Sequence, residues 1–337
     1  MKQKVFVTGE SGMLATAIIK KLKEHSDFYD IVNEWKEFDE FRTYYNDYHF
    51  LNGKKIKEFE IDILHEELID KLIQVLDNKS IIIHTAAYVN TDKCEADPYE
   101  AVKTNVLGTQ NLIDVVDITD CYLVNFSTTA VFDPTEYMKN KGVFDESAKV
   151  DPKTIYGLTK YNAELAVKQS LKHSRYITIK PVFIYGDFPF DNSSMLRKIM
   201  EKAYKAKVDI EDDEKLMVFL GQLIPKDYMY YEFFGDMFFE ILKNLQLFHH
   251  EDFIISRNYP RRFADYLSRI KEITGVNVNS MENIEFNHYG DYLQNHNGIS
   301  KNFYKWFPDF ELNKEAYNDY YGLQKLYNSI KKYYEQI

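Results

Sequence analysis

A tyrosine and a lysine lie four residues apart in the run Tyr156-Gly157-Leu158-Thr159-Lys160. On a helix this spacing brings both side chains to one face. A phenol with its ordinary pKa of about 10 is a reluctant acid–base group at neutral pH, but a nearby ammonium favours the phenolate. The pair could therefore transfer a proton, which typically accelerates a reaction by about 10²–10⁴-fold. Because the chain has 27 tyrosines, the same spacing could also be a surface pair that arose by chance.

A glycine turn, Thr8-Gly9-Glu10-Ser11-Gly12-Met13-Leu14-Ala15, stands where the apolar run 5–7 gives way to a helical pattern. A dinucleotide-binding turn needs one glycine for a tight bend, a second for close approach of pyrophosphate, and a small third residue for helix packing. Gly9, Gly12 and Ala15 meet these needs in order. The amides at the helix start could then hold phosphates without a cation. An ordinary strand–helix connection is the competing interpretation.

Three hydroxyl residues, Ser127, Thr128 and Thr129, follow directly after the apolar run 124–126. The spacing of Tyr156 and Lys160 alone favours a surface pair. The glycine turn and this hydroxyl-rich strand end, found together in one chain, favour an active site instead.

The carboxylate that usually meets the adenosine ribose of NAD lies about 20 residues beyond the turn. Glu34 is the nearest fit in this sequence, and a solvated surface charge is the alternative. Lys36 and Arg42 stand close by, and a cation there would favour a 2′-phosphate. The sequence therefore leaves the choice between NAD and NADP open.

Short apolar runs alternate with helical patterns through the first half of the chain. We expect strands at 5–7, 29–32, 59–61, 81–83, 122–126 and 176–179, and helices at 14–25, 68–76, 99–116 and 156–173. This alternation predicts an α/β fold with a doubly wound parallel sheet and helices on both faces. The stretch from 34 to 50 has no clear period and is interpreted as part of an insertion.

The pattern changes near residue 180, where the alternation weakens and aromatic residues begin to cluster. We expect a dinucleotide-binding domain over 1–180, with a returning segment near 226–257. A smaller, mixed α/β substrate domain is expected over 181–337, with helices at 262–274 and 315–334 and a solvated loop at 211–214.

The formal charge is −11, from 42 Lys and Arg against 53 Asp and Glu. Such a chain is a poor candidate for binding a nucleic-acid backbone, which needs a basic face. Two cysteines, Cys94 and Cys121, fit two free thiols in a reducing compartment and no metal site. The start of the sequence leaves no room for a signal peptide, and no apolar stretch has the length of a membrane span. We therefore expect a cytoplasmic protein without a membrane partner.

With these motifs in order, the chain resembles an extended short-chain dehydrogenase/reductase of the NAD-dependent epimerase/dehydratase superfamily. Within it, the resemblance is to the dTDP-4-dehydrorhamnose reductases and their relatives, from Lys4 to about Gly186. The motifs that carry it are the 8–15 turn, Asp62-Ile63, 84–88, 92–95, 105–112, Ser127-Thr128, 131–133 and Tyr156–Lys160 with Glu164.

The resemblance implies a Rossmann-type fold, a bound NADP or NAD, and a nucleotide-diphosphate sugar as substrate. It implies that Tyr156 transfers the proton to or from a sugar oxygen, that Thr128 hydrogen-bonds that oxygen, and that Lys160 lowers the pKa of Tyr156 and binds the nicotinamide ribose. The implied cofactor-binding residues are Thr8, Gly9, Ser11, Gly12, Met13, Leu14, Glu34, Asp62, Ile63, Ala86, Ala87, Tyr156 and Lys160. For Asp62, a helix N-cap is the alternative.

Two departures from the family pattern bear on the reaction. Sugar dehydratases of this group carry Asp-Glu after the active-site threonine, where this chain has Thr129-Ala130, so dehydration is not expected. The reductases usually carry Asp-Tyr there, and the 34–58 stretch is longer than expected, so the substrate can differ from dehydrorhamnose. The candidate substrate-binding residues are Thr128, Thr129, Asn192 and Arg261; for the last, an exposed charge at a helix start is the alternative.

The leading hypothesis is therefore an NAD(P)-dependent nucleotide-sugar oxidoreductase that reduces a 4-keto-6-deoxy sugar. The first alternative is an epimerase that holds NAD tightly and re-reduces the sugar it oxidises. The second is a non-catalytic, NADP-binding regulatory subunit, against which the intact Thr128, Tyr156 and Lys160 argue. A homodimer is one assembly consistent with the sequence.

Overall fold

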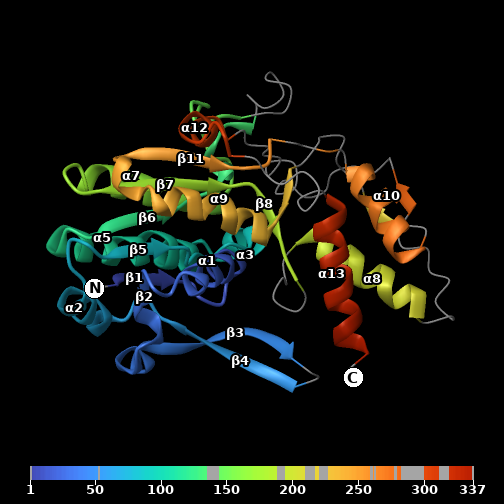
Figure 1. The fold of residues 1–337 in the computed structure, drawn as a ribbon, viewed down its shortest axis with the longest axis horizontal. Helices are drawn as coiled ribbons and strands as arrows, with labels where there is room; N and C mark the ends of the chain where they lie inside the picture. The colour runs from blue at the N-terminus through green and yellow to red at the C-terminus, as the bar shows by residue number, and fades with distance from the viewer. Residues whose placement is uncertain are drawn as a thin grey trace.

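A six-stranded parallel sheet forms the centre of the protein (Figure 1). This computed structural model describes residues 2–51, 54–134, 144–187, 194–208, 217–219, 227–258, 261, 263–276, 279–281, 300–310 and 319–335. The strands lie in the order β11 (Glu251–Ile255), β7 (Tyr176–Pro181), β6 (Tyr122–Phe126), β5 (Ile81–His84), β1 (Gln3–Thr8) and β2 (Tyr29–Ile31). Every neighbouring pair is parallel, which confirms the predicted α/β fold.

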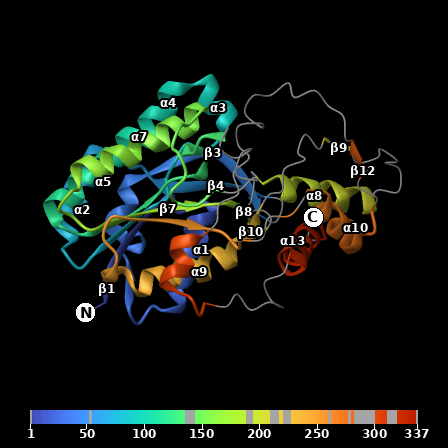
Figure 2. The ribbon, with the colours of Figure 1, turned by 90° about the horizontal axis from the view of Figure 1, so that it is seen from above.

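Helices cover both faces of this sheet, as Figure 2 shows from above. On one face lie α2 (Glu66–Val75), α5 (Gly108–Thr119) and α7 (Ile155–Ser170), and on the other α1 (Met13–Glu24) and α9 (Tyr231–Lys243). Successive strand residues point to opposite faces, so each apolar run fills two cores. Phe6, Ile82 and Leu123 belong to the core under α2, α5 and α7, whereas Val7 and Val124 belong to the core under α1 and α9.

The predicted helix at 99–116 is continuous but not regular. It begins as α4 (Pro98–Val102), passes through one π-helical turn, η3 (Lys103–Leu107), and continues as α5. Asp97 caps its start by accepting a hydrogen bond from the amide of Glu100 at 3.2 Å, directly after the short helix α3 (Thr91–Ala96). A π turn inserted in an α-helix often lies at a functional site, and this one carries Asn105.

The expectation that 59–61 forms a strand of the parallel sheet is wrong. After two short 3-10 turns, η1 (Val32–Glu34) and η2 (Lys36–Phe41), the chain forms an antiparallel hairpin of β3 (Arg42–Leu51) and β4 (Lys54–Ile61). The hairpin extends away from the sheet (Figure 1). Its two strands satisfy each other's backbone groups, and β2 is left as the edge of the sheet with β1 as its neighbour.

Beyond β7 the chain forms smaller units. β8 (Phe183–Tyr185) pairs in parallel with β10 (Tyr228–Tyr230), and β9 (Met217–Phe219) with β12 (Asn279–Met281). Helices α8 (Met195–Val208), α10 (Phe263–Thr274) and α13 (Asp319–Tyr334) pack against one another, and the last two match the predicted helices at 262–274 and 315–334.

Before α10 the chain returns to the sheet: β11, which follows α9 and the turn η5 (Leu245–Leu247), pairs with β7. Later in the chain, α12 (Lys301–Trp306) packs on β11. The loop expected at 211–214 lies outside the described residues. The division into domains at residue 180 stays a prediction. Within the described residues, no helix is long and apolar enough to cross a membrane.

Candidate active site

The glycine turn joins β1 to α1 in a conformation that favours glycine. Gly9 has φ of +65°, and a Cβ added there would lie 2.8 Å from the Cα of Ala86. Gly12 donates its amide to the carbonyl of Gly9 at 2.9 Å and is the N-cap of α1, where it provides no side-chain hydrogen bond. The first turn of α1 also carries no acidic residue, so its amides suit an anion. The other predicted residues of this turn, Ser11, Met13 and Leu14, are half-buried.

Thr8 anchors the turn through a buried hydrogen-bond chain rather than by facing solvent. Its hydroxyl accepts from the amide of Ala86 at 3.0 Å and lies 2.8 Å from Nδ1 of His84. Nε2 of His84 lies 2.9 Å from the hydroxyl of Thr109, which itself donates to the carbonyl of Asn105. This series of hydrogen bonds assigns the ring proton of His84 to Nε2, because the hydroxyls of Thr8 and Thr109 then each donate one hydrogen bond. Burial, with the nearby charge of Lys160, lowers the pKa of His84 to about 3.

Thr128 and Tyr156 meet between the carboxyl end of β6 and the first turn of α7. Thr128 is the N-cap of the short turn η4 (Thr129–Val131) and accepts from the amide of Ala130 at 3.1 Å. Its hydroxyl also lies close enough to the phenol of Tyr156 to lower the pKa of that phenol. Because Thr128 already accepts from Ala130, its own proton can be donated to Tyr156. Thr154 caps α7 by accepting from the amide of Gly157 at 3.0 Å, which fixes the helix start beside this pair.

Burial raises the pKa of Tyr156 to about 12, although the hydrogen bond from Thr128 opposes this rise. The expectation that Lys160 lowers this pKa is therefore wrong for this arrangement: the phenol stays protonated, and Lys160 is not among the groups that shift it. A protonated phenol is the form that can donate a proton.

The ammonium of Lys160 is buried one turn along α7, with 2% of the residue exposed. Within the described residues no hydrogen bond or ion pair of its ammonium is found. Burial lowers the pKa of Lys160 to about 8, and the charge of Glu164 opposes this lowering. An ammonium group donates hydrogen bonds, so Lys160 suits an acceptor supplied by a ligand.

Asn105 is a residue whose place in the site the sequence did not reveal. Its side chain accepts from the amide of Tyr88 at 2.7 Å and donates to the hydroxyl of Thr159 at 2.9 Å. Thr159 in turn donates to the carbonyl of Tyr156 at 2.9 Å. The π turn that carries Asn105 thus ties the loop after β5 to the helix of the Tyr156–Lys160 pair. The resemblance included Asn105, but a helix-stabilising contact explained it equally well.

A buried charged network lies behind the same helix. Glu164 accepts a hydrogen bond from the hydroxyl of Ser127 and pairs with the ammonium of Lys180 at 3.2 Å. Lys180 also reaches Asp252 of β11 at 3.4 Å, and Asp252 pairs with Lys168 at 3.3 Å. This network joins β6, α7, β7 and β11. Lys180 was not predicted as part of it, because its partners lie far away in sequence.

Among the predicted cofactor residues, Asp62 and Ile63 lie in the loop between β4 and α2. Asp62 accepts from the amide of Leu64 at 2.9 Å and is not a helix cap, because α2 begins after His65. Ile63 is buried against Gly108, where an added Cβ would lie 2.4 Å from its Cδ1. Ala87 is half-buried in the loop after β5, beside Ala86.

Glu34, the predicted ribose carboxylate, lies on the surface. Its side chain is 55% exposed and pairs with the equally exposed Lys23 at 2.6 Å. A different carboxylate, Glu10, is 14% exposed within the glycine turn and pairs with Arg42. The sequence shows that Glu10 lies in the turn, but it does not indicate that Glu10 contacts Arg42, which is 32 positions away.

The predicted substrate residues are less well placed. Thr129 is buried beside Thr128, with 5% exposed. Asn192 lies outside the described residues. Arg261 is half-buried two residues before α10, so its role toward a substrate stays a prediction.

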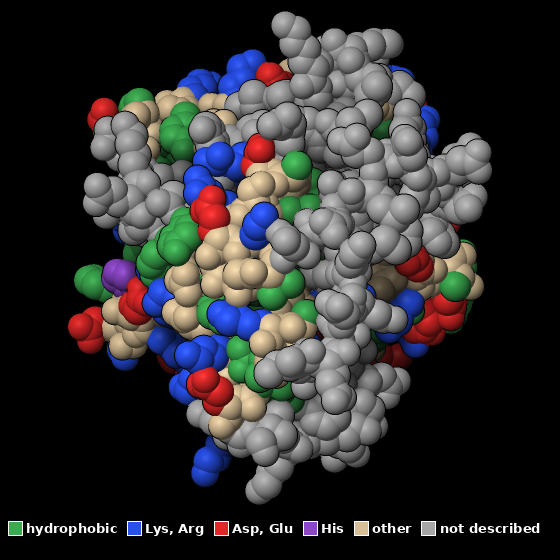
Figure 3. All heavy atoms as spheres, turned by 90° about the vertical axis from the view of Figure 1, so that its right-hand side faces the viewer, with side chains coloured by type: hydrophobic (Ala, Val, Ile, Leu, Met, Phe, Trp, Pro, Cys, Tyr) green, Lys and Arg blue, Asp and Glu red, His purple; other side chains and the backbone are tan. Residues whose placement is uncertain are grey.

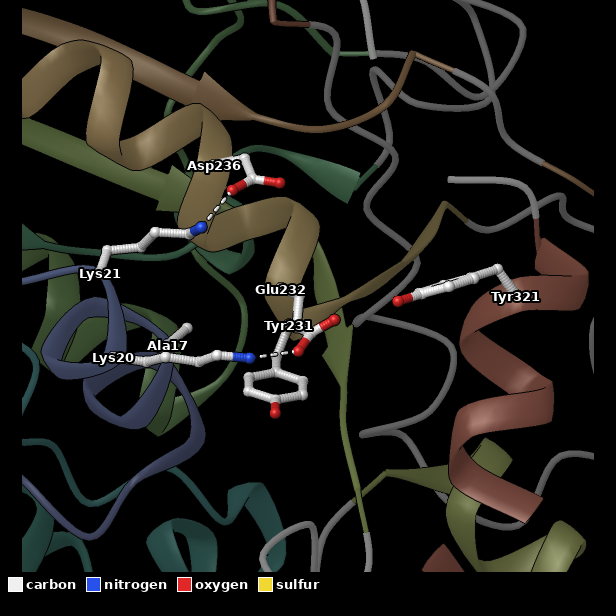
Figure 4. Close-up of a pocket in the computed structure, with 7 residues that line it drawn as sticks. All are labelled: Ala17, Lys20, Lys21, Tyr231, Glu232, Asp236 and Tyr321. Carbon is white, nitrogen blue, oxygen red and sulfur yellow. Dashed lines mark hydrogen bonds and ion pairs between the residues drawn. The ribbon is translucent and has the colours of Figure 1, made fainter. Parts of the chain in front are cut away.

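A separate pocket opens between α1, α9 and α13 (Figure 4). Lys20 faces Glu232 and Lys21 pairs with Asp236 at 2.7 Å across it, while Tyr321 points toward it from α13. These charges neutralise one another, and Tyr156 and Lys160 do not line the pocket. In Figure 3, the described surface on the side of α8 and α13 likewise mixes both signs of charge rather than forming one acidic patch.

Known proteins share sequence similarity with this chain over about half of their own length. An uncharacterized membrane protein of Methanocaldococcus jannaschii is 29% identical over 202 residues, 60% of this chain and 54% of that protein. A probable low-salt glycan biosynthesis reductase of Haloferax volcanii is 26% identical over 54% of this chain and 53% of its own. The methionine adenosyltransferase 2 subunit beta of Xenopus laevis is 28% identical over 59% and 52%. The chain thus spans about half the length of these curated relatives.

Solved structures share the fold over nearly the whole chain. A dTDP-4-dehydrorhamnose reductase from Bacillus anthracis, in complex with NADP, superposes with a TM-score of 0.68 at 19% identity and covers 100% of both chains. A UDP-glucuronic acid 4-epimerase from Bacillus cereus, in complex with NAD, gives 0.72 at 17% identity, with 99% of this chain and 98% of that chain covered. These likenesses confirm the predicted Rossmann-type fold.

A family model agrees with the resemblance stated from the motifs. The RmlD substrate binding domain model matches residues 3–216, a range that includes the glycine turn, Thr128, Tyr156 and Lys160. Because this match spans more than half of the 337 residues, the chain belongs to the RmlD substrate binding domain family.

Proposed function

We propose that this protein is an NAD(P)-dependent nucleotide-sugar oxidoreductase that reduces a 4-keto-6-deoxy sugar. One observation carries the proposal: the hydroxyl of Thr128 lies close enough to the phenol of Tyr156 to act on its pKa, and the buried Lys160 follows one turn later on α7. These three groups lie at the carboxyl ends of the sheet strands, where α/β folds bind ligands.

The residues present fit a dinucleotide. Gly9 and Gly12 keep side chains out of the β1–α1 turn, and the first amides of α1 suit pyrophosphate. When bound, NAD(P)H would supply a hydride to the carbonyl carbon of the sugar. Lys160 is the residue that would hold the nicotinamide ribose hydroxyls, because its ammonium can donate hydrogen bonds to them.

The chain's own residues would then handle the proton. Tyr156, whose phenol is protonated at neutral pH, would donate the proton of Oη to the sugar oxygen as that oxygen gains charge. Thr128 would donate a hydrogen bond to the same oxygen and hold it in place. We further propose that residues 1–180, with the returning segment near 226–257, bind the dinucleotide, and that 181–337 mainly bind the nucleotide sugar.

The test is a panel of nucleotide-linked 4-keto sugars incubated with NADH or NADPH, with the loss of absorbance at the reduced nicotinamide as the readout. Net oxidation with at least one sugar supports the proposal. Interconversion of sugar epimers, with dinucleotide retained through purification and no net oxidation, would instead favour the epimerase. Dinucleotide binding with no turnover on any sugar would favour a non-catalytic subunit.

A further inference from the structure

The corner where β1 and β2 end holds a partly buried carboxylate. Glu10, the residue after the first glycine of the turn, has a side chain that is 14% exposed. One of its oxygens accepts from Nδ2 of Asn33 at 3.1 Å, and the other pairs with the guanidinium of Arg42. Asn33 is fixed in turn to β1, because it accepts from the amide of Val7 at 2.8 Å and donates to its carbonyl at 2.6 Å.

The guanidinium of Arg42 is engaged from several sides. Besides Glu10, it lies 3.4 Å from the carboxylate of Asp39, and it donates to the carbonyl of Asn33 at 2.8 Å. Among the described side chains, two carboxylates therefore share this one cation. These side chains hold Glu10 in place and give the corner no surplus of positive charge.

In a doubly wound sheet, the adenosine ribose of a dinucleotide lies beside the end of the second strand. Glu10 and Asn33 occupy that place here, whereas Glu34 points to solvent and pairs with Lys23. We propose that Glu10, positioned by Asn33 and Arg42, is the residue that recognises the adenosine ribose, and that it makes the protein prefer NAD(H) over NADP(H). This inference rests on the proposed dinucleotide-dependent function.

The chemistry of the two dinucleotides differs only at the ribose 2′ position. A 2′-hydroxyl can donate a hydrogen bond to the carboxylate of Glu10. A 2′-phosphate has no proton to donate as a dianion and brings roughly two negative charges to a corner where Glu10 and Asp39 already outnumber Arg42. Burial raises the pKa of Glu10, an indication that its surroundings do not stabilise added negative charge, although Arg42 opposes the rise.

Lys36 is the cation that could reverse this preference, since it is exposed near the same corner. It follows Trp35, and no ion pair of Lys36 with Glu10 or Asp39 is found among the described residues. If Lys36 or Arg42 instead bound a 2′-phosphate, the preference would be for NADP(H), which the test below separates.

The experiment measures direct binding, without any sugar. NADH and NADPH are titrated separately into the full chain by calorimetry, for the wild type, Glu10→Gln and Glu34→Gln. We expect the wild type to bind NADH about tenfold or more tighter than NADPH, and Glu10→Gln to narrow that ratio by about tenfold. Glu34→Gln, which removes an exposed carboxylate, should leave the ratio within about twofold.

The outcomes distinguish this inference from the proposed function. If the wild type binds NADPH as tightly as NADH or more tightly, only this inference is overturned. The inference is also overturned if Glu10→Gln leaves the ratio of NADH to NADPH affinity unchanged while Glu34→Gln changes it. Binding of neither dinucleotide overturns both. The wild-type ratio needs no variant, so it decides the question even if Glu10→Gln unfolds, which circular dichroism would reveal.

Discussion

The ammonium of Lys180 lies 3.2 Å from the carboxylate of Glu164, and neither side chain is more than 3% exposed. Glu164 follows Lys160 by one turn of α7 and raises the pKa of that lysine, against the effect of burial. It also accepts a hydrogen bond from Ser127, the neighbour of Thr128. Glu164, held by Lys180, thus acts on the charge of Lys160 and also binds the residue next to Thr128.

Breaking this pair from one side should destabilise the protein. Among the described residues, Glu164→Gln leaves the buried Lys180 with Asp252 as its remaining ion-pair partner, and loss of one member of a buried pair costs about 3–5 kcal/mol. The double variant Glu164→Leu/Lys180→Met removes both charges and should cost less than the single one. Urea unfolding monitored by circular dichroism measures both values. A single variant as stable as the wild type would contradict this account.

Gly9→Ala should disturb the turn for two reasons, a strained φ and a clash with Ala86. Gly275 offers a matched control, since its φ of +78° is similar but nothing lies within 4 Å of an added Cβ. We expect Gly275→Ala to cost about 1–2 kcal/mol from backbone strain alone, and Gly9→Ala to cost more. Gly9→Ala should also weaken dinucleotide binding. Equal unfolding free energies for the two variants would show that the approach of Ala86 does not matter.

His84 should make the protein less stable at mildly acidic pH. Its pKa is lowered to about 3 in the folded chain, against about 6.5 when unfolded, so the unfolded chain takes up the proton first. The stability that neutral His84 contributes is complete above pH 6.5 and is lost as the pH falls toward 3, by up to about 1.4 kcal/mol per pH unit. The free energy of unfolding should therefore depend less on pH between 6 and 4 in His84→Gln. His65→Gln, at an exposed site, controls for the loss of an imidazole. If the free energy of unfolding changes with pH equally in His84→Gln and the wild type, the lowered pKa of His84 is refuted.

The hydroxyl group of Thr128, rather than the shape of the side chain, should matter for turnover. Thr128→Val keeps the volume but removes the hydroxyl that would donate to the reacting oxygen, and loss of one such donor typically costs about 10²–10³ in kcat. Thr128→Ser keeps the hydroxyl and should retain most of the rate. Steady-state kinetics with the best sugar of the panel compares the two. Equal rates for the serine and valine variants would exclude the proposed hydrogen bond to the reacting oxygen.

Local patterns predicted most of the sheet, because each strand and its following helix can be read within one window of sequence. The run 5–7, the glycine turn and the Tyr156–Lys160 spacing are of this kind. The hairpin β3–β4 was missed as a hairpin because the choice of partner for residues 59–61 depends on the edge of the sheet, which no local pattern describes.

Contacts between distant residues limited the prediction of the site in the same way. Glu34 has the right spacing for the ribose carboxylate, yet the fold turns it to solvent. Glu10 is surrounded by Arg42 and Asn33, which are distant from it in sequence. Lys160 is only 2% exposed because α7 packs against the rest of the fold. The lowered pKa expected for Tyr156 failed for this reason too, because burial raises the pKa and Lys160 is not among the groups that shift it.

The most direct test of the central claim is the rate of dinucleotide-dependent keto-sugar reduction by Tyr156→Phe. Tyr99→Phe, at a tyrosine that is 72% exposed, is the matched control. The account predicts a fall in kcat of about 10²–10⁴ for Tyr156→Phe, with the Kd for the dinucleotide nearly unchanged, and no change for Tyr99→Phe. Full activity in Tyr156→Phe would contradict it.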